Sequence, residues 1–140
     1  MTAQVVQDLK SVFADANQLD PQQLAQIYDR NVQFTDPLHK IEGIETVTEY
    51  FTKMYRNVTS CQFNYIDEMA LENRACLRWE MHLQHPRLDS GREIIVAGAS
   101  FLWFGEQITH HDDYYDLGAM LYEHVAVLGS AIKYVKGRLG

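Results

Sequence analysis

The sequence predicts an α+β fold in which helices come first, a mainly antiparallel sheet follows and a helix closes the chain. Up to about residue 55, apolar residues recur every three or four positions, as on one face of a helix. Between residues 60 and 116 the pattern changes to that of strands separated by short turns. A length of 140 residues with 46% hydrophobic residues is enough to form a core without disulfides or a bound metal. We therefore expect a single domain over residues 1–140.

Three helices are expected before residue 60 and one at the end of the chain. The first covers residues 3–16, and its apolar side is formed by Val5, Val6, Leu9, Val12, Phe13 and Ala16. The second begins at Asp20-Pro21, a capping residue followed by proline at the first helical position, and runs to about Arg30. The third covers Ile44 to Met54. The last starts at Leu117, with Gly129 as a possible break into two pieces.

Five segments read as strands. They are residues 31–36, 60–70, 73–85, 91–104 and 107–116. The first ends before Pro37, which cannot continue an inner strand, and the turn residues 37–43 follow. The short links between the other four predict an antiparallel meander. Because Glu93 to Phe104 is apolar on both faces, the sheet needs a cover on each side, and a second subunit could supply one of them.

The composition excludes several classes of partner. With 12 Lys and Arg against 19 Asp and Glu, the net charge of −7 argues against binding to nucleic acid. No apolar run approaches the roughly 20 residues that span a bilayer, and residues 1–10 lack the layout of a secretion signal, so we expect a soluble, cytoplasmic protein without a membrane partner. The sequence has no Gly-rich phosphate loop, Cys-x-x-Cys or Gly-x-Ser-x-Gly motif, so no cofactor is expected.

Two cysteines, Cys61 and Cys76, lie on strands that a turn near Glu72-Asn73 would join. In that hairpin the two positions do not face each other across the strands. We therefore expect both thiols to be reduced rather than linked in a disulfide.

Two motifs, taken with this order of elements, resemble a known superfamily. Phe34-Thr35-Asp36-Pro37 precedes Gly43, and residues 108–117 combine two histidines with an Asp-Tyr-Tyr-Asp run. These features resemble the nuclear transport factor 2-like superfamily, and most closely its SnoaL-like branch. The resemblance implies a cone-shaped, curved sheet wrapped around the N-terminal helices, an apolar pocket for a small hydrophobic molecule, and a homodimer formed through the outer face of the sheet. Members include isomerases, polyketide cyclases, epoxide hydrolases and proteins without known chemistry, so the fold alone does not choose a function.

Asp36 resembles the general base of ketosteroid isomerase. The two oxyanion donors of that enzyme are not matched, because their positions fall at about Val12 or Phe13 and near Ser100. Without two strong donors, much of the barrier to enolate formation is left unaddressed, so steroid isomerisation itself is not expected. Asp36 also has a structural alternative, since an aspartate before proline often caps the backbone N–H groups of a turn.

A second partial match is to limonene epoxide hydrolase, whose arginine and two acids resemble Arg78, Glu80 and Asp113. Arg78 and Glu80 lie two apart on one strand and so share a face, where the cation can hold a carboxylate ionised. The match is incomplete, since Phe34 replaces a tyrosine that orients water and Asp36 replaces an asparagine.

The strand over residues 73–85 leaves two orientations open. Its polar set, which alternates cleanly with an apolar set that includes Trp79, consists of Arg78, Glu80, His82 and Gln84. Periodicity alone places the polar set in solvent. The resemblance instead places it in the cavity and turns Trp79 outward, toward a dimer partner, and this orientation is slightly favoured.

The run from His110 to Asp113 resembles a metal cluster, but successive strand residues point to opposite faces and leave only two ligands on a side. No metal site is therefore expected. The resemblance assigns His111, Asp113 and Tyr115 to the pocket, where His111 could act as an acid or base near neutral pH. A buried, hydrogen-bonded strand end is the alternative. Tyr50, Met54 and Tyr55 are expected as pocket wall or core.

Together these observations predict a small-molecule cavity protein that performs acid–base chemistry without a cofactor on a small apolar carbonyl or epoxide compound. The expected catalytic residues are Asp36, Asp113, Arg78, Glu80 and His111, with Asp36 and Asp113 as the acid–base pair. The expected substrate-binding residues are Phe34, Tyr55, Val96, Ser100 and Tyr115. The alternative is a non-catalytic ligand-binding or dimeric interaction module.

Overall fold

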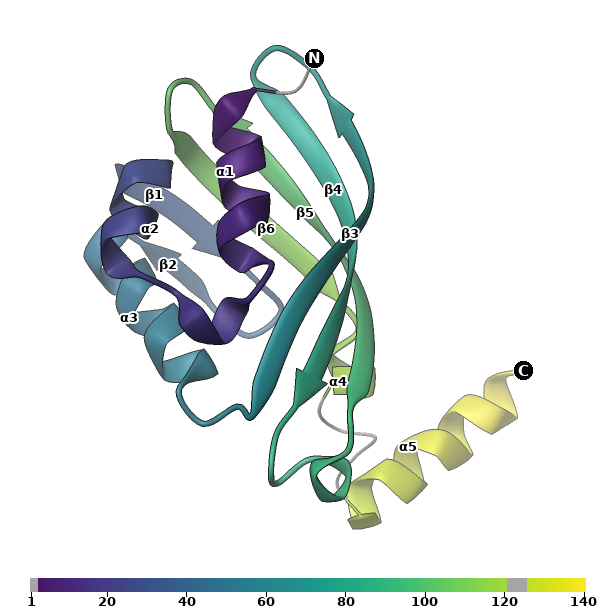
Figure 1. The fold of residues 1–140 in the computed structure, drawn as a ribbon. Helices are drawn as coiled ribbons and strands as arrows, with labels where there is room; N and C mark the ends of the chain where they lie inside the picture. The colour runs from purple at the N-terminus through teal and green to yellow at the C-terminus, as the bar shows by residue number, and fades with distance from the viewer. Residues whose placement is uncertain (1–2, 121–125) are drawn as a thin grey trace.

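A computed structural model describes residues 3–120 and 126–140 and has an α+β fold (Figure 1). The helices are α1 (Gln4–Phe13), α2 (Pro21–Ile27), α3 (Ile44–Tyr55), α4 (Leu117–Met120) and α5 (Ala126–Leu139), with short 3-10 turns η1 (Ala16–Gln18) and η2 (Asp89–Gly91). The strands are β1 (Tyr28–Thr35), β2 (Lys40–Glu42), β3 (Ser60–Ala70), β4 (Arg74–Gln84), β5 (Ile94–Phe104) and β6 (Ile108–Tyr115). The predicted fold class, with N-terminal helices, a mainly antiparallel sheet and a C-terminal helix, is confirmed.

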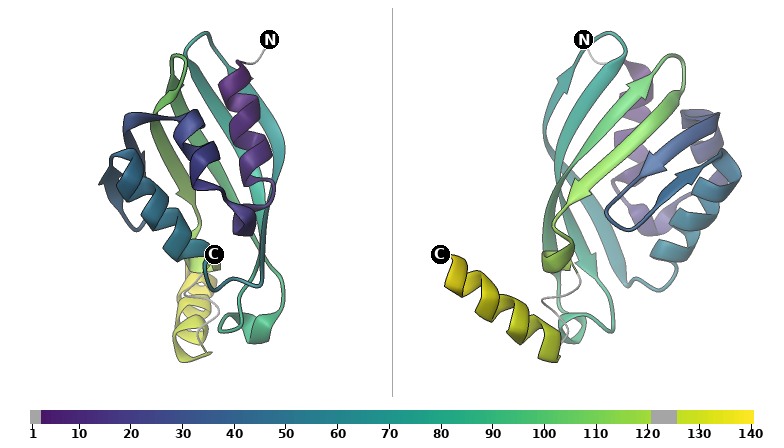
Figure 2. Two further views of the ribbon diagram at one scale, coloured as in Figure 1. Left: turned by 60° about the vertical axis from the view of Figure 1, so that its left-hand side comes forward. Right: turned by 180° about the vertical axis from the view of Figure 1, so that it is seen from behind.

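The six strands form one curved, unclosed sheet in the order β2-β1-β6-β5-β4-β3. Strands β3 to β6 form the predicted antiparallel meander, and β1 joins it by pairing in parallel with β6. Helices α1, α2 and α3 lie on the concave side of the sheet (Figures 1 and 2). The N-terminal and C-terminal parts of the chain therefore meet at the β1–β6 pair, which lies beside the helices.

The structure corrects three of the expected elements. Helix α2 ends at Ile27 rather than near Arg30, because Tyr28 already begins β1. Residues 40–42, expected within a turn, form the edge strand β2 opposite residues 33–35 of β1. Helix α5 continues through Gly129, so that glycine does not break it. The apolar positions 121 and 125 of the predicted last helix lie outside the described residues.

The core lies between the concave face of the sheet and the three N-terminal helices. Aromatic rings dominate it, with the Phe51 ring centroid 5.3 Å from that of Phe13 and 5.0 Å from that of Phe34. On β5 one face is buried, whereas Ile95 and Phe101 on the other face are 51% and 41% exposed. Among the described residues no helix covers this outer face (Figure 2).

A β-bulge at Ile66 changes which side chains of β3 face inward. Before it, Tyr65 pairs with Trp79, and after it, Glu68 pairs with Leu77, so the inward set passes from odd-numbered to even-numbered residues. Glu68 then reaches Lys10 of α1 at 2.7 Å. The bulge thus lets one long strand cover apolar core at one end and form an ion pair with α1 at the other.

The two cysteines are free, as predicted. Cys61 lies opposite Leu83 and Cys76 opposite Met69 in the β3–β4 register. Burial raises the pKa of the Cys61 thiol to about 12, so this thiol stays protonated at neutral pH.

Trp79 on β4 packs inward against Gly98 of β5. The two residues are register partners, and a Cβ atom on residue 98 would lie 2.3 Å from the indole ring. A side chain at this position would therefore displace the ring. Gly98 therefore makes room for Trp79 on the concave face of the sheet.

No helix among residues 3–120 and 126–140 is long and apolar enough to cross a membrane.

Candidate functional site

A small, partly enclosed pocket of about 30 Å³ lies between the concave sheet face and helices α1 and α3. Seven of the residues predicted at the site line it: Phe34, Asp36, Tyr55, Ser100, His111, Asp113 and Tyr115. They come from β1, the turn after it, α3, β5 and β6. The rest of the wall is largely aromatic and apolar, so the polar groups lie in a surrounding of low polarity.

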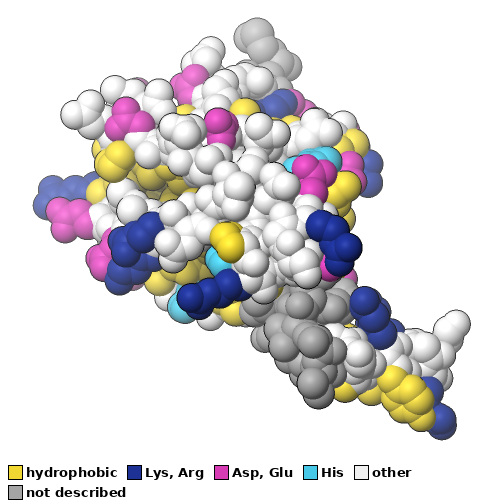
Figure 3. All heavy atoms as spheres, turned by 60° about the horizontal axis from the view of Figure 1, so that its bottom comes forward, with side chains coloured by type: hydrophobic (Ala, Val, Ile, Leu, Met, Phe, Trp, Pro, Cys, Tyr) yellow, Lys and Arg dark blue, Asp and Glu magenta, His cyan; other side chains and the backbone are white. Residues whose placement is uncertain are grey.

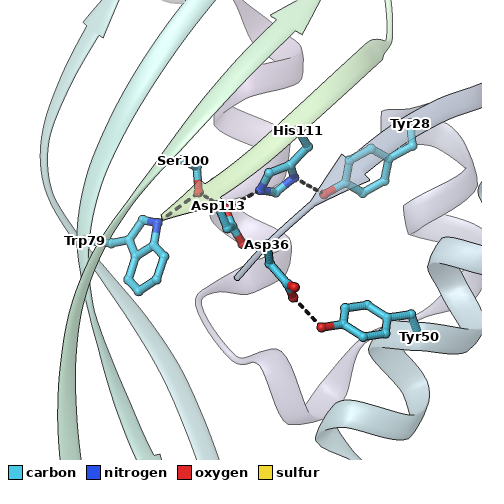
Figure 4. Close-up of polar contacts among 7 residues, drawn as sticks. All are labelled: Tyr28, Asp36, Tyr50, Trp79, Ser100, His111 and Asp113. Carbon is cyan, nitrogen blue, oxygen red and sulfur yellow. Dashed lines mark hydrogen bonds and ion pairs between the residues drawn. The ribbon is translucent and has the colours of Figure 1, made fainter. Parts of the chain in front are cut away.

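Five polar side chains form a continuous hydrogen-bonded chain across this pocket (Figure 4). The Tyr28 hydroxyl lies 2.7 Å from His111 Nδ1, and His111 Nε2 lies 2.7 Å from Asp113 Oδ1. From the other side, Ser100 Oγ donates to the same Asp113 oxygen at 2.5 Å. Trp79 Nε1 in turn donates to Ser100 Oγ at 2.9 Å. The hydrogen bonds from Tyr28 through His111 and from Trp79 through Ser100 therefore meet at Asp113.

Tyr28 and Trp79, the end members of this hydrogen-bonded series, set the direction of its hydrogen bonds. Burial, followed by the charge of Asp113, raises the pKa of Tyr28 well above its usual value, so its hydroxyl stays protonated and can donate to His111. Because His111 Nδ1 then accepts, the ring proton is assigned to Nε2, which donates to Asp113. The indole N–H of Trp79 can only donate. One Asp113 oxygen thus accepts two hydrogen bonds.

The second Asp113 oxygen receives no hydrogen bond from the described residues. The Asp113 side chain is 15% exposed, whereas that of His111 is 4% exposed. Both residues line the pocket, and Asp113 is the more exposed member of the pair. This geometry suits a carboxylate that is held by one oxygen and accepts a proton with the other.

Asp36 forms a second, separate polar group. Its Oδ1 accepts the backbone N–H groups of Leu38 and His39 at 2.8 Å each, and its Oδ2 accepts the hydroxyl of Tyr50. Burial, followed by the hydrogen bond to Asp36, raises the pKa of Tyr50, so Tyr50 donates. Asp36 thus holds the turn after β1, as its structural alternative predicted, and also lines the pocket.

Tyr115 presents a buried hydroxyl without a partner among the described residues. Burial, followed by the charges of Asp36 and Asp113, raises the pKa of Tyr115, so the hydroxyl stays protonated. A buried donor without an acceptor is costly, by about 1–3 kcal/mol. This hydroxyl is therefore a candidate donor to a molecule bound in the pocket.

The predicted orientation of β4 is wrong. Trp79 is 1% exposed and lines the pocket, while Arg78 is exposed and Glu80 half-buried on the opposite face of the strand. The expected set of Arg78, Glu80 and Asp113 is therefore not brought together. Periodicity alone describes this strand correctly.

Val96 also differs from its prediction. It is fully buried in the core opposite Met81 and is not among the residues that line the pocket. In place of Val96, Arg78 and Glu80, the structure adds Tyr28, Tyr50 and Trp79 to the site. Tyr28 was assigned to the end of a helix, and Tyr50 and Trp79 bear no motif that marks them as hydrogen-bond donors.

The site combines two carboxylates, one histidine and several protonated hydroxyls in an apolar surrounding, an arrangement able to move protons. Within the described part of the chain, no three His, Cys, Asp or Glu residues are grouped so that they could hold a metal ion.

A curved, unclosed sheet that wraps around helices and encloses a pocket with carboxylates defines the class of cone-shaped cavity proteins with the nuclear transport factor 2-like fold. Within this class, the chain belongs to the SnoaL-like domain family, whose model matches residues 9–111. No curated protein matches the sequence significantly.

Many solved structures share the fold. A candidate SnoaL-like polyketide cyclase from Shewanella putrefaciens CN-32 is 17% identical, with a TM-score of 0.74 over 90% of this chain and 98% of that one. A protein with a ketosteroid isomerase-like fold from Catenulispora acidiphila, in complex with trimethylamine, is 16% identical, with a TM-score of 0.74 over 86% and 92%. An NTF2-like protein of unknown function from Burkholderia pseudomallei is 11% identical, with a TM-score of 0.73 over 86% and 96%. At these identities the likeness establishes the fold only.

Proposed function

We propose that the protein binds a small, mainly apolar molecule and performs cofactor-independent acid–base chemistry on it, as an isomerase or cyclase would. The observation that carries this proposal is the free oxygen of Asp113, which faces the pocket while Ser100 and His111 hold its other oxygen. A carboxylate fixed in this way can take a proton from carbon without losing its orientation.

The proposed reaction begins with a C–H bond next to a carbonyl group. Asp113 Oδ2 takes the proton, and the electron pair of the C–H bond moves into the developing enolate. The Tyr115 hydroxyl donates to the carbonyl oxygen on which negative charge accumulates. Return of the proton from Asp113 to a second carbon completes an isomerisation. In a cyclisation the enolate carbon instead bonds to another carbonyl carbon, the electron pair of that C=O bond moves to its oxygen, and this oxygen takes up the proton from Asp113. An epoxide oxygen is a second acceptor that Tyr115 could bind.

The other polar residues support these two. His111 and Ser100, which also line the pocket, position Asp113 through their hydrogen bonds to its Oδ1. Asp36, which accepts hydrogen bonds from two backbone N–H groups and from Tyr50, is the second member of the acid–base pair. Phe34 and Tyr55 form part of the apolar wall of the pocket, against which the substrate would pack.

A panel of simple compounds tests the proposal: cyclohexanone, 3-cyclohexenone and 1,2-epoxycyclohexane, each in deuterated buffer with NMR detection. We expect deuterium to enter next to a carbonyl, or the ring to be opened, faster than in buffer alone. An Asp36→Asn/Asp113→Asn double variant, in which both carboxylates are neutral, should react at the buffer rate. Equal rates for wild type and double variant would contradict an acid–base function.

A non-catalytic ligand-binding module is the second candidate, favoured by the way Asp36 is used. Both of its oxygens accept hydrogen bonds that hold the turn after β1, so this carboxylate has a sufficient structural role. Saturable binding of the same compounds, without turnover of any of them, would support this candidate over the enzyme.

We also propose a homodimer formed through the outer face of the sheet. This face exposes Met69, Ile95, Phe101 and Tyr114, which are between 41% and 71% exposed in the single chain. Clustered apolar surface of this kind marks association surfaces. We expect wild type to sediment as a dimer and Phe101→Glu as a monomer. Val135→Glu on the exposed helix α5 is the control, and dissociation by that variant alone would place the interface on α5 instead.

A further inference from the structure

A second, larger cavity adjoins the pocket at the end of the body where β4 and α3 end. This outer groove has a volume of about 340 Å³, and its apolar walls include Val58, Met81, Leu83 and Leu88. Met54 and Tyr55 of α3 line both the groove and the pocket, so these side chains form a wall common to the two cavities. Figure 3 brings this end of the molecule forward, with Lys, Arg and His side chains beside apolar ones.

The two volumes decide where the body of a ligand lies. The pocket has a volume of about 30 Å³, against about 340 Å³ for the outer groove. A reacting group such as a carbonyl would lie in this smaller cavity, beside Asp113. The body of an elongated ligand would then lie in the outer groove, which is about ten times larger, is mostly apolar and shares Met54 and Tyr55 with the pocket.

The ionisable groups of the two cavities have opposite character. The pocket is lined by Asp36 and Asp113, and no Lys or Arg is among its described lining residues. The outer groove is lined by His85 and Arg87, and no Asp or Glu is among the described residues there. A ligand that spans both cavities therefore meets acidic groups at its inner end and basic groups at its outer end.

His85 and Arg87 are both oriented as hydrogen-bond donors. His85 Nδ1 accepts the backbone N–H of Arg87 at 3.1 Å, which leaves Nε2 to carry the proton of the neutral ring. The Arg87 guanidinium can only donate, and no ion pair to it is present in the described part of the chain. The nearest acid in sequence, Asp89, is instead paired with Arg92 at 3.2 Å.

From these observations we propose that the ligand is an elongated apolar monoanion, such as a carboxylate, whose anionic end binds Arg87 and His85 at the outer groove. This proposal rests on the proposed function, because the neutral oxygen at the other end of the molecule is the one held by Tyr115. The orientation is fixed by charge: an anion in the pocket would be repelled by Asp36 and Asp113, and a net charge of −7 gives the surface as a whole no attraction for anions.

Three probes of equal chain length test the proposal by titration calorimetry at low ionic strength, below their critical micelle concentrations. They are decanoate, decanol and decyltrimethylammonium, which differ in the charge of one end. We expect decanoate to bind about tenfold more tightly than decyltrimethylammonium, with decanol between them, because attraction is replaced by repulsion at Arg87. Octanoate should bind roughly fifteenfold more weakly than decanoate, since each buried methylene contributes about a fourfold factor.

Two arginine variants supply the matched comparison. Arg87→Gln should weaken decanoate binding about threefold to fivefold and leave decanol unchanged, as expected for an exposed charge pair. Arg92→Gln removes a neighbouring arginine that does not line the groove. It should leave the binding of both decanoate and decanol unchanged. Equal effects of the two variants, or binding of decyltrimethylammonium as tight as that of decanoate, would overturn the proposal.

The outcome is separable from that of the proposed function. If decanoate binds as described but no panel compound turns over, the ligand class stands and the acid–base function fails. If the small ketones turn over but decanoate does not bind, the function stands and the ligand class is wrong. Leu88→Glu, which places a like charge in the groove, should abolish decanoate binding.

Discussion

Replacing Asp113 by asparagine is expected to lower turnover of any panel substrate by at least about 100-fold, the smaller end of what a positioned general base contributes. The amide keeps the size of the carboxylate and can still accept hydrogen bonds from Ser100 and His111 through its oxygen. It cannot take a proton from carbon. Initial rates followed by NMR, with enzyme in excess where turnover is slow, measure the loss.

The neighbouring residue provides the matched control for this variant. Asp112 precedes Asp113 on β6 and faces the opposite side of the sheet, where it pairs in register with Phe101. Asp112→Asn makes the same chemical change outside the pocket and should retain full activity. If Asp113→Asn kept more than about a tenth of wild-type activity, the assignment of Asp113 as the general base would be refuted.

Replacing Trp79 by alanine is expected to lower the free energy of unfolding by about 3–5 kcal/mol. The indole is 1% exposed, its ring centroid lies 4.8 Å from that of Phe63, and it fills the space left by Gly98. Its removal leaves a cavity that the neighbouring glycine cannot fill, and it takes away the N–H donor of Ser100. Urea denaturation followed by circular dichroism measures the change.

Two further variants separate the contributions of the indole. Trp79→Phe retains most of the buried ring and loses the hydrogen bond, so it should cost less, about 1–3 kcal/mol. Trp103→Ala removes a half-buried indole from the outer face and should cost less than Trp79→Ala. A loss for Trp79→Ala no larger than that for Trp103→Ala would contradict the inward packing of Trp79.

The fold could be predicted in detail from local patterns, because most of its elements are determined by residues close in sequence. The alternation in residues 73–85 identified β4 and its two faces. Which face turns inward was not a local property. It depends on Gly98, whose missing side chain leaves room for Trp79, and that pairing joins residues nineteen apart. The resemblance favoured the wrong face because it carried over the roles of Arg78 and Glu80 without this packing constraint.

The site residues that belong to sequence motifs were predictable, whereas those that tertiary packing brings to the site were not. Asp36, His111 and Asp113 were found from the motifs around them, and the structure brings all three to one pocket. Tyr28 was missed because it lies next to the apolar stripe of α2, and only its place in β1 turns it toward His111. No pattern in the sequence indicates that Tyr50 meets Asp36, since the contact depends on how α3 packs against the turn after β1.

The parallel pairing of β1 with β6 has a consequence for how the protein acquires its site. Tyr28 and His111 are separated by 83 positions along the chain, whereas the strands of the meander pair with their neighbours in sequence. Closing a long loop costs more chain entropy than closing a short hairpin, so contacts of this kind tend to form late in folding. A chain that had folded only its meander would already hold Trp79, Ser100 and Asp113 but would lack Tyr28 and Asp36. The complete site would then form in the last step of folding rather than in the first.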